Sequence, residues 1–232
     1  QVLIVAGSDS GGGAGIQADI KAVSALGAYA MTAISALTAQ NTLGVQGVYP
    51  IPTDFIEQQI DSVLTDLGAD CVKTGMLHES AVIETVVAAL DRLAPHVPVV
   101  VDPVMVAKGG ASLLQDEAIE TLRTRLVPRA TVLTPNVPEA EALSGMTATD
   151  EASLDHMAEV LLSLGPQAVL LKGGHREGDI VRDRLVTADG TRIFENPRID
   201  TMHTHGTGCT LASSITAGIA QGLSLADAVE RA

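Results

Sequence analysis

The sequence is poor in aromatic and basic side chains. It has no tryptophan, two tyrosines and two phenylalanines, and its 14 Lys plus Arg stand against 28 Asp plus Glu, a formal net charge of -14. Few aromatic rings leave little for stacking on bases. A strongly negative chain repels phosphodiester backbones and anionic lipid surfaces. We therefore expect neither a nucleic acid nor a membrane as partner.

Cysteine and long apolar runs are scarce as well. Cys71 and Cys209 are far apart and form no C-x-x-C spacing, which excludes a disulfide framework or zinc knuckle and favours a reducing, cytoplasmic compartment. Residues 22–53 carry no charge, but Gly, Asn, Gln, Thr and Pro interrupt them, so they indicate buried strands with loops rather than a membrane span. The chain begins with Gln1 and ends within a helical pattern. We expect it to lack its extreme N-terminus and C-terminal end.

The sequence is rich in short apolar runs that alternate with amphipathic ones. Of its residues 46% are hydrophobic and 18% charged, enough for a large core. Strands are predicted in residues 2–7, 29–37, 69–75, 97–104, 130–136 and 168–174. Helices are predicted in residues 13–26, 54–67 with Thr53 as N-cap, 80–93, 116–126, within 139–164, from 207 onward and in 225–232.

Residues 183–196 contain two strand-like runs about Asp189-Gly190, a hairpin signal. No repeat, linker or charge run divides the chain, so we predict one domain over residues 1–232. Its fold class is α/β, a three-layer α/β/α sandwich with a mostly parallel central sheet and a small antiparallel hairpin. Ligands are then expected beyond the carboxyl ends of the strands.

The segment HTHGTGCT gives the sharpest candidate site. Its Gly-Thr-Gly, residues 206–208, opens a helix whose free N–H groups and dipole favour an anion, although a plain glycine turn would look the same. Cys209 is either a base or nucleophile whose pKa the dipole lowers, or a small buried hydrophobe. His203 and His205 have a metal-like spacing, yet ordinary loop histidines are the favoured interpretation.

The first glycine-rich segment, AGSDSGGGAG, lacks the lysine of a P-loop and the spacing of a dinucleotide fingerprint. Its glycines can instead let the backbone approach a small substrate, with Asp19 and Gln40 supplying hydrogen bonds. Asp19 could equally be a solvated helix residue.

Acidic and amide groups follow two later strands. Asn136 and Glu139 suit either a magnesium ion or a capping box. Asp102 ends a buried run and needs a partner such as a cation. Lys172 ends another and could neutralise phosphate charge.

Seven strand-end segments occur in an order that resembles the ribokinase superfamily, most closely its hydroxymethylpyrimidine/phosphomethylpyrimidine kinase branch in thiamine biosynthesis. They are AGSDSGGGAGIQAD, ALTAQNT, KTGML, DPVM with AKGG, TPNVPEAE, KGGH and HGTGCT. The resemblance implies a ribokinase-like fold, ATP as phosphoryl donor and Mg²⁺. It also implies that the substrate is 4-amino-5-hydroxymethyl-2-methylpyrimidine and then its monophosphate. We further expect a homodimer.

The resemblance also implies roles for individual residues. Expected pyrimidine contacts are Gly7, Asp19, Gln40, Met76 and Val104, and the expected contact with the substrate phosphate is Lys108. Expected Mg²⁺-organising residues are Asp102, Asn136 and Glu139. Expected nucleotide-phosphate and catalytic residues are Lys172, Gly206, Thr207, Gly208 and Cys209, with Cys209 as base. Two alternatives stay open, a pyridoxal or pyridoxine kinase of the same superfamily and a non-catalytic ligand-binding relative.

Overall fold

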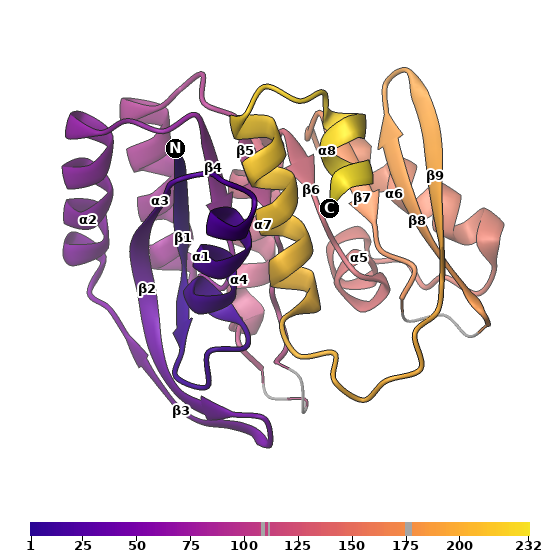
Figure 1. The fold of residues 1–232 in the computed structure, drawn as a ribbon, viewed down its shortest axis with the longest axis horizontal. Coiled ribbons are helices and arrows are strands. Elements are labelled where there is room, and N and C mark those ends of the chain that lie inside the picture. Colours follow the sequence, from indigo (N-terminus) through magenta and orange to yellow (C-terminus); the bar gives the residue numbers. More distant parts are fainter. Residues whose placement is uncertain (108–109, 111, 175–177) are drawn as a thin grey trace.

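A nine-stranded sheet organises the chain in this computed structural model, which describes residues 1–107, 110, 112–174 and 178–232. The strands lie in the order β3-β2-β1-β4-β5-β6-β7-β8-β9 (Figure 1). Their bounds are β1 Val2–Asp9, β2 Ala30–Asn41, β3 Gly44–Pro50, β4 Cys71–Thr74, β5 Val99–Val101, β6 Val132–Leu133, β7 Ala168–Leu171, β8 Ile180–Thr187 and β9 Gly190–Pro197. Pairing is parallel from β2 to β7, and β3, β8 and β9 pair antiparallel with their neighbours.

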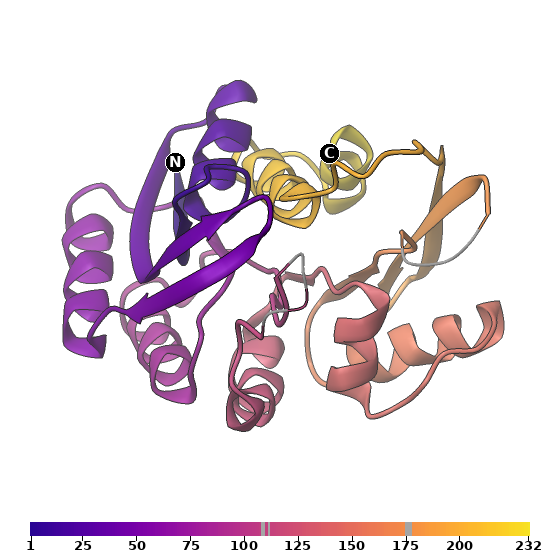
Figure 2. The same ribbon diagram turned by 90° about the horizontal axis from the view of Figure 1, so that it is seen from below.

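Helices cover both faces of the sheet (Figure 2). One face carries α1 (Gly15–Ala25), α7 (Thr207–Ala220) and α8 (Leu225–Arg231). The other carries α2 (Thr53–Asp66), α3 (Ser80–Leu93), α4 (Asp116–Thr121), α5 (Val137–Ser144) and α6 (Glu151–Ser163). This confirms the predicted three-layer sandwich.

Strand alternation explains why the central strands are apolar throughout. In β1, Leu3 and Val5 pack into the core beneath α2 and α3, whereas Val2, Ile4 and Ala6 pack against α1 and α7. All five are at most 1% exposed. Because a strand turns successive side chains to opposite faces, a strand covered on both sides has no solvent face to mark with polar residues.

The hairpin predicted in residues 183–196 is confirmed as β8 and β9, and the structure differs from the prediction at the other end of the sheet and at two helices. Strand β3 was not predicted, and it adds a second antiparallel edge beside β2. Thr53 lies inside α2, whose N-cap is Pro52, so its predicted capping role is wrong. The helix predicted over 116–126 is α-helical only to Thr121 and continues as a π-helical turn, Leu122–Leu126. No helix among the described residues is long and apolar enough to span a bilayer.

Candidate active site

The predicted pyrimidine contacts gather where β1, β4 and β5 end. Gly7 is so close to Met76 that a Cβ on Gly7 would lie 2.5 Å from the Met76 Cε atom. Met76 packs in one apolar cluster with Ala36 and half-buried Val104. Gln40, near the end of β2, is half-buried and its Oε1 atom accepts a hydrogen bond from Thr38, 3.1 Å away. These residues form one wall, apolar with an amide at its rim.

Asp19 lies deeper than a solvated helix residue. Its carboxylate, on α1, is 0% exposed and accepts hydrogen bonds from Lys73 Nζ to both oxygens at 3.0 Å. Ser213 on α7 donates a further bond of 2.7 Å to Oδ1. The helix α1 thus places a paired carboxylate beneath the substrate-side loops, and the alternative of a solvated Asp19 is wrong.

Lys73 is the site residue that the sequence analysis missed. It lies on β4 and is 0% exposed. Burial lowers the pKa of its ammonium, but the negative charges of Asp19, Cys209 and Asp102 outweigh that effect and raise the pKa above its ordinary value. The available signal was a lysine inside an apolar strand run, which is rare unless the charge is paired.

Asp102 lies between two lysines. Its Oδ2 atom is 4.0 Å from Lys73 Nζ and its Oδ1 atom is 3.4 Å from Lys172 Nζ. Thr134 also donates a hydrogen bond of 3.4 Å to Oδ1. The carboxylate therefore has the cationic partners that its position at the end of a buried strand requires.

Asn136 and Glu139 form the capping box of α5. The Asn136 side chain accepts from the Glu139 N–H at 2.9 Å, and Glu139 Oε2 accepts from the Asn136 N–H at 2.8 Å. Burial raises the pKa of Glu139 to about 7, against the opposing attraction of Lys172. The capping interpretation is confirmed, and one Glu139 oxygen takes no part in the box.

Lys172 joins this acidic region to helix α7. Burial lowers the pKa of Lys172, but Asp102, Glu139 and Cys209 outweigh that effect and raise it. A Cβ on Gly208 would lie 3.2 Å from Lys172 Nζ, so the ammonium faces the first turn of α7. Among the described residues, no three His, Cys, Asp or Glu side chains are grouped to hold a metal ion.

The first turn of α7 has the geometry of an anion-binding helix terminus. Gly206 is the N-cap in a left-handed conformation, with φ of 81°, and no side chain caps the helix. Thr207 is exposed, and Gly208 and Cys209 are half-buried. The first N–H groups of a helix have no intrahelical acceptor and point outward along its axis.

The pKa of Cys209 is raised, whereas the helix dipole predicts a lowered pKa. Burial raises it to about 11, and the nearby charge of Lys73 offsets only part of that increase. The other cysteine, Cys71, is fully buried, and burial raises its pKa to about 12. Both are free thiols. Lys108, the predicted contact for a substrate phosphate, lies outside the described residues.

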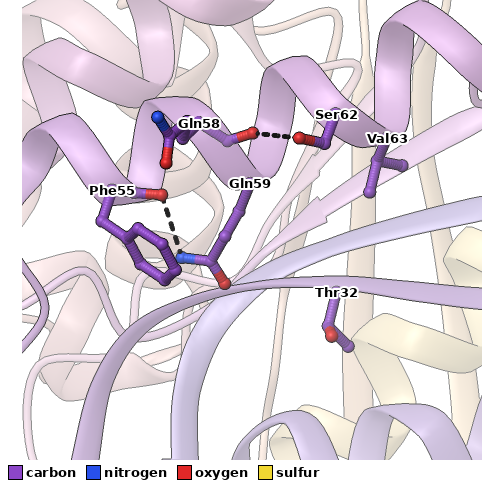
Figure 3. A pocket seen from close by; sticks show the side chains of 6 residues that line it. All are labelled: Thr32, Phe55, Gln58, Gln59, Ser62 and Val63. Atoms are coloured by element: carbon purple, nitrogen blue, oxygen red, sulfur yellow. Dashed lines mark hydrogen bonds between the residues drawn. The ribbon is translucent and has the colours of Figure 1, made fainter.

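A separate hollow lies between β2 and α2, away from these strand ends (Figure 3). Gln59 points from α2 toward β2, where its amide pairs with the N–H and C=O of Ile34 at 2.9 and 3.2 Å. The amide thus covers backbone groups of β2 beyond the end of β3. No charged side chain lines this hollow, so it does not compete with the strand ends as a site for an anionic ligand.

A buried charge network beside a helix terminus, at the carboxyl edge of a mostly parallel sheet, defines a ribokinase-type small-molecule kinase. Residues 9–232 match the family described as phosphomethylpyrimidine kinase. The chain belongs to this family.

Individual relatives agree with the family match. The chain is 50% identical over 231 residues to the hydroxymethylpyrimidine/phosphomethylpyrimidine kinase of Bacillus subtilis, covering 99% of this chain and 85% of the relative. A crystal structure of phosphomethylpyrimidine kinase from Clostridium difficile matches with a TM-score of 0.88 and 41% identity, over 99% of this chain and 94% of that one. An ADP complex of Bacillus subtilis pyridoxal kinase matches with a TM-score of 0.91 and 37% identity, over 99% and 87%.

Proposed function

We propose that the chain transfers the γ-phosphoryl group of ATP to hydroxymethylpyrimidine and then to its monophosphate, in thiamine biosynthesis. The observation that carries this proposal is the full-length relationship to hydroxymethylpyrimidine/phosphomethylpyrimidine kinases, together with a complete set of charged strand-end groups. A relative that only bound ligand would not need that charge network.

The substrate ring is proposed to bind against Gly7, Met76 and Val104, with Gln40 and Asp19 as the polar contacts. Met76 and Val104 give an apolar surface for the ring, and Gln40 offers amide hydrogen bonds at its edge. Burial raises the pKa of Asp19 and the charge of Lys73 opposes that rise. The carboxylate is proposed to accept from an N–H group of the ligand. Lys108 remains the proposed contact for the phosphate of the second substrate.

The phosphoryl group is proposed to pass in front of the first turn of α7. Phosphoryl transfer depends mainly on positioning and on neutralising charge on the equatorial oxygens. Gly206 and Gly208 offer backbone N–H groups there, and the Thr207 N–H would leave the Thr204 carbonyl oxygen, 3.4 Å away, to join them. Lys172 adds a positive charge against Gly208. Cys209 is the proposed base for the substrate hydroxyl, whose proton leaves late in a loose transition state.

The proposed Mg²⁺-organising residues suit an ion that enters the site bound to the nucleotide. Asp102 and Glu139 provide two carboxylates, and Asn136 an amide, while one Glu139 oxygen takes no part in the capping box. Magnesium is typically held by one or two carboxylates, waters and substrate phosphates rather than by a full protein cage. When bound, the ion would neutralise phosphate charge. Burial raises the pKa of Glu139, and a bound cation would oppose that rise by favouring the ionised form.

The test is to incubate the purified protein with MgATP and, separately, hydroxymethylpyrimidine, its monophosphate and pyridoxal, and to identify the products by mass spectrometry. Conversion of both pyrimidines is expected. Product from pyridoxal alone would move the assignment to the pyridoxal kinases, whose fold this chain matches equally well. No product from any substrate would contradict a kinase.

We also propose that the enzyme is a homodimer in a reducing, cytoplasmic compartment. Exposed apolar side chains on the β2–β3 arm support the dimer: Leu37 and Tyr49 are opposite each other and 43% and 66% exposed, and Leu43 at the tip is 88% exposed. Free thiols at both cysteines agree with the compartment. Sedimentation equilibrium at micromolar concentration should give twice the mass of the chain, and a monomer would contradict the dimer.

A further inference from the structure

Asp9, at the end of β1, organises the glycine-rich loop that follows it. Its Oδ1 atom accepts from the Gly11 N–H at 2.8 Å, and its Oδ2 atom accepts from Gly13 and Ala14 at 3.0 and 2.8 Å. Burial raises the pKa of Asp9, but hydrogen bonds from His205 and these amides outweigh it and hold the pKa below its ordinary value. The carboxylate is therefore ionised at neutral pH, and the loop is fixed around it.

His205 attaches the entry of α7 to that carboxylate. Its Nε2 atom lies 2.9 Å from Asp9 Oδ2, across 196 residues of sequence. A carboxylate only accepts hydrogen bonds, so Nε2 is the donor. The pair is sheltered, since the side chains of His205 and Asp9 are 18% and 3% exposed.

A second contact lies one residue further along. A Cβ on Gly206 would come within 1.7 Å of the Gly13 carbonyl oxygen, and one on Gly13 within 2.4 Å of the His205 ring. The two glycine-rich segments therefore touch backbone to backbone. This close approach is possible only because both positions lack a side chain.

Several contacts hold the first half of α7: Gly15 donates a backbone hydrogen bond to Cys209, Ser213 donates to Asp19, and His205 at the entry of the helix bonds to Asp9. No side chain caps the helix at Gly206, and Thr207 bonds only within its own loop, to the Thr204 carbonyl oxygen. The link from His205 to Asp9 is thus a side-chain hydrogen bond that ties the loop before α7 to the sheet. The hydrogen bond from His205 to Asp9 therefore bears on how the N–H groups of residues 206–209 are oriented relative to the loop after β1.

We propose that His205 is a positioning residue for phosphoryl transfer. Through Asp9 it holds the anion-binding turn of α7 in register with the glycine-rich loop that follows β1, the strand that carries the proposed substrate contact Gly7. The inference rests on the proposed kinase function and adds a role for a histidine that touches no reacting atom. Because a displacement of about 1 Å can slow an enzymatic step on the order of 100-fold, loss of the link is expected to lower kcat more than it raises KM.

The experiment compares His205→Gln with His205→Leu. Glutamine keeps an N–H donor that can reach Asp9, whereas leucine keeps side-chain volume without a donor. His203→Ala is the matched control, because His203 is exposed and lies in the same loop. For each variant we would measure kcat and KM with hydroxymethylpyrimidine and MgATP, the melting temperature, and amide hydrogen exchange of the peptide spanning residues 203–212.

We expect kcat to fall about 10- to 100-fold in His205→Leu, with KM changed less than about threefold and faster exchange in that peptide. His205→Gln should recover most of kcat, and the control should match the wild-type protein. Equal kcat for the leucine and glutamine variants would overturn the proposal. If the leucine variant does not fold, His205→Ala takes its place in the same comparison.

The two proposals fail in different ways. Absence of any pyrimidine product from the wild-type protein would contradict the kinase function. Hydrogen exchange needs no turnover, so it would still report whether His205 holds the turn of α7: unchanged exchange in His205→Leu would contradict the link even where the enzyme is active.

Discussion

At the scale of single residues, the least ordinary group in the site is the Cys209 thiol. A helix N-terminus favours a thiolate, but burial has the larger effect here and raises the pKa to about 11. A base with so high a pKa is mostly protonated at neutral pH. Only the thiolate can accept the proton of a substrate hydroxyl, so the proposed role of Cys209 as base depends on the small ionised fraction.

Alkylation tests this pKa directly. In the free enzyme, the rate of Cys209 modification by iodoacetamide should rise about tenfold per pH unit between pH 8 and 10, because only the thiolate reacts. Mass spectrometry of the 203–212 peptide would measure the rate, with Cys71 expected to stay unmodified because it is 0% exposed. A plateau below pH 9 would show an unperturbed or lowered pKa.

The catalytic role of the same thiol is a separate prediction. Cys209→Ala should lose most of kcat, by about 100-fold or more, because it removes the proposed base and leaves the anion-binding turn in place. Binding of a nucleotide, followed by isothermal titration calorimetry, should change little. Turnover within a factor of about three of the wild-type rate would remove Cys209 from the role of base.

At the scale of secondary-structure elements, the buried pair Asp19–Lys73 ties α1 to β4. Both side chains are 0% exposed, and Ser213 adds a tie to α7. Such a pair does not strongly favour folding, because desolvation of two charges offsets their attraction. Removal of one partner is costly all the same, since it leaves the other charge buried and alone.

Lys73→Met is therefore expected to destabilise the protein by about 3–5 kcal/mol, measured by urea unfolding. The double variant Lys73→Met with Asp19→Asn should regain most of that stability while remaining inactive. Lys21→Met, an exposed lysine on α1, is the control and should cost less than about 1 kcal/mol. Equal stability of the two lysine variants would show that Asp19 does not depend on Lys73.

A comparison of the central strands with β3 shows which secondary structure the sequence could predict and which it could not. The central strands were predictable because their runs of valine, leucine and isoleucine are buried on both faces. Strand β3 was missed because Gly44, Gly47 and Pro50 read as a loop, and its residues are exposed or half-buried. Its strand conformation comes from pairing with β2, a contact that local preference does not encode.

The same limit applies to the candidate site. Most of its residues were found from motifs at strand ends. Lys73 was not: a lysine inside an apolar strand run signals a paired charge, but its partner Asp19 lies 54 residues away and cannot be identified locally. His205 was read as a loop residue for the same reason, since the acceptor that explains it is 196 residues distant. The choice between capping and metal binding at Asn136 needed the geometry of the α5 terminus.

At the scale of the whole molecule, one apolar core joins both halves of the sheet. Among the described residues, the largest apolar cluster runs from Leu3 and Val5 on β1 to Val186 on β8. We propose that the chain unfolds as a single domain.

Thermal unfolding should then follow one transition by two probes. Tyrosine fluorescence reports Tyr29 and Tyr49, and far-ultraviolet circular dichroism reports all helices and strands. Coincident midpoints are expected, and both should rise when MgATP is added at concentrations above its dissociation constant. Separate midpoints would contradict the single domain.

The tie between Asp9 and His205 also orders events during synthesis on the ribosome. Strand β1 emerges early, yet helix α7, which packs against α1 and β1, carries the turn that completes the site. At 5–20 residues per second, the 196 residues between the two partners correspond to about 10–40 s of translation. A nascent chain that ends before α7 therefore lacks the helix that covers part of one face of its sheet. On the proposed function, phosphoryl transfer requires α7 to be in place.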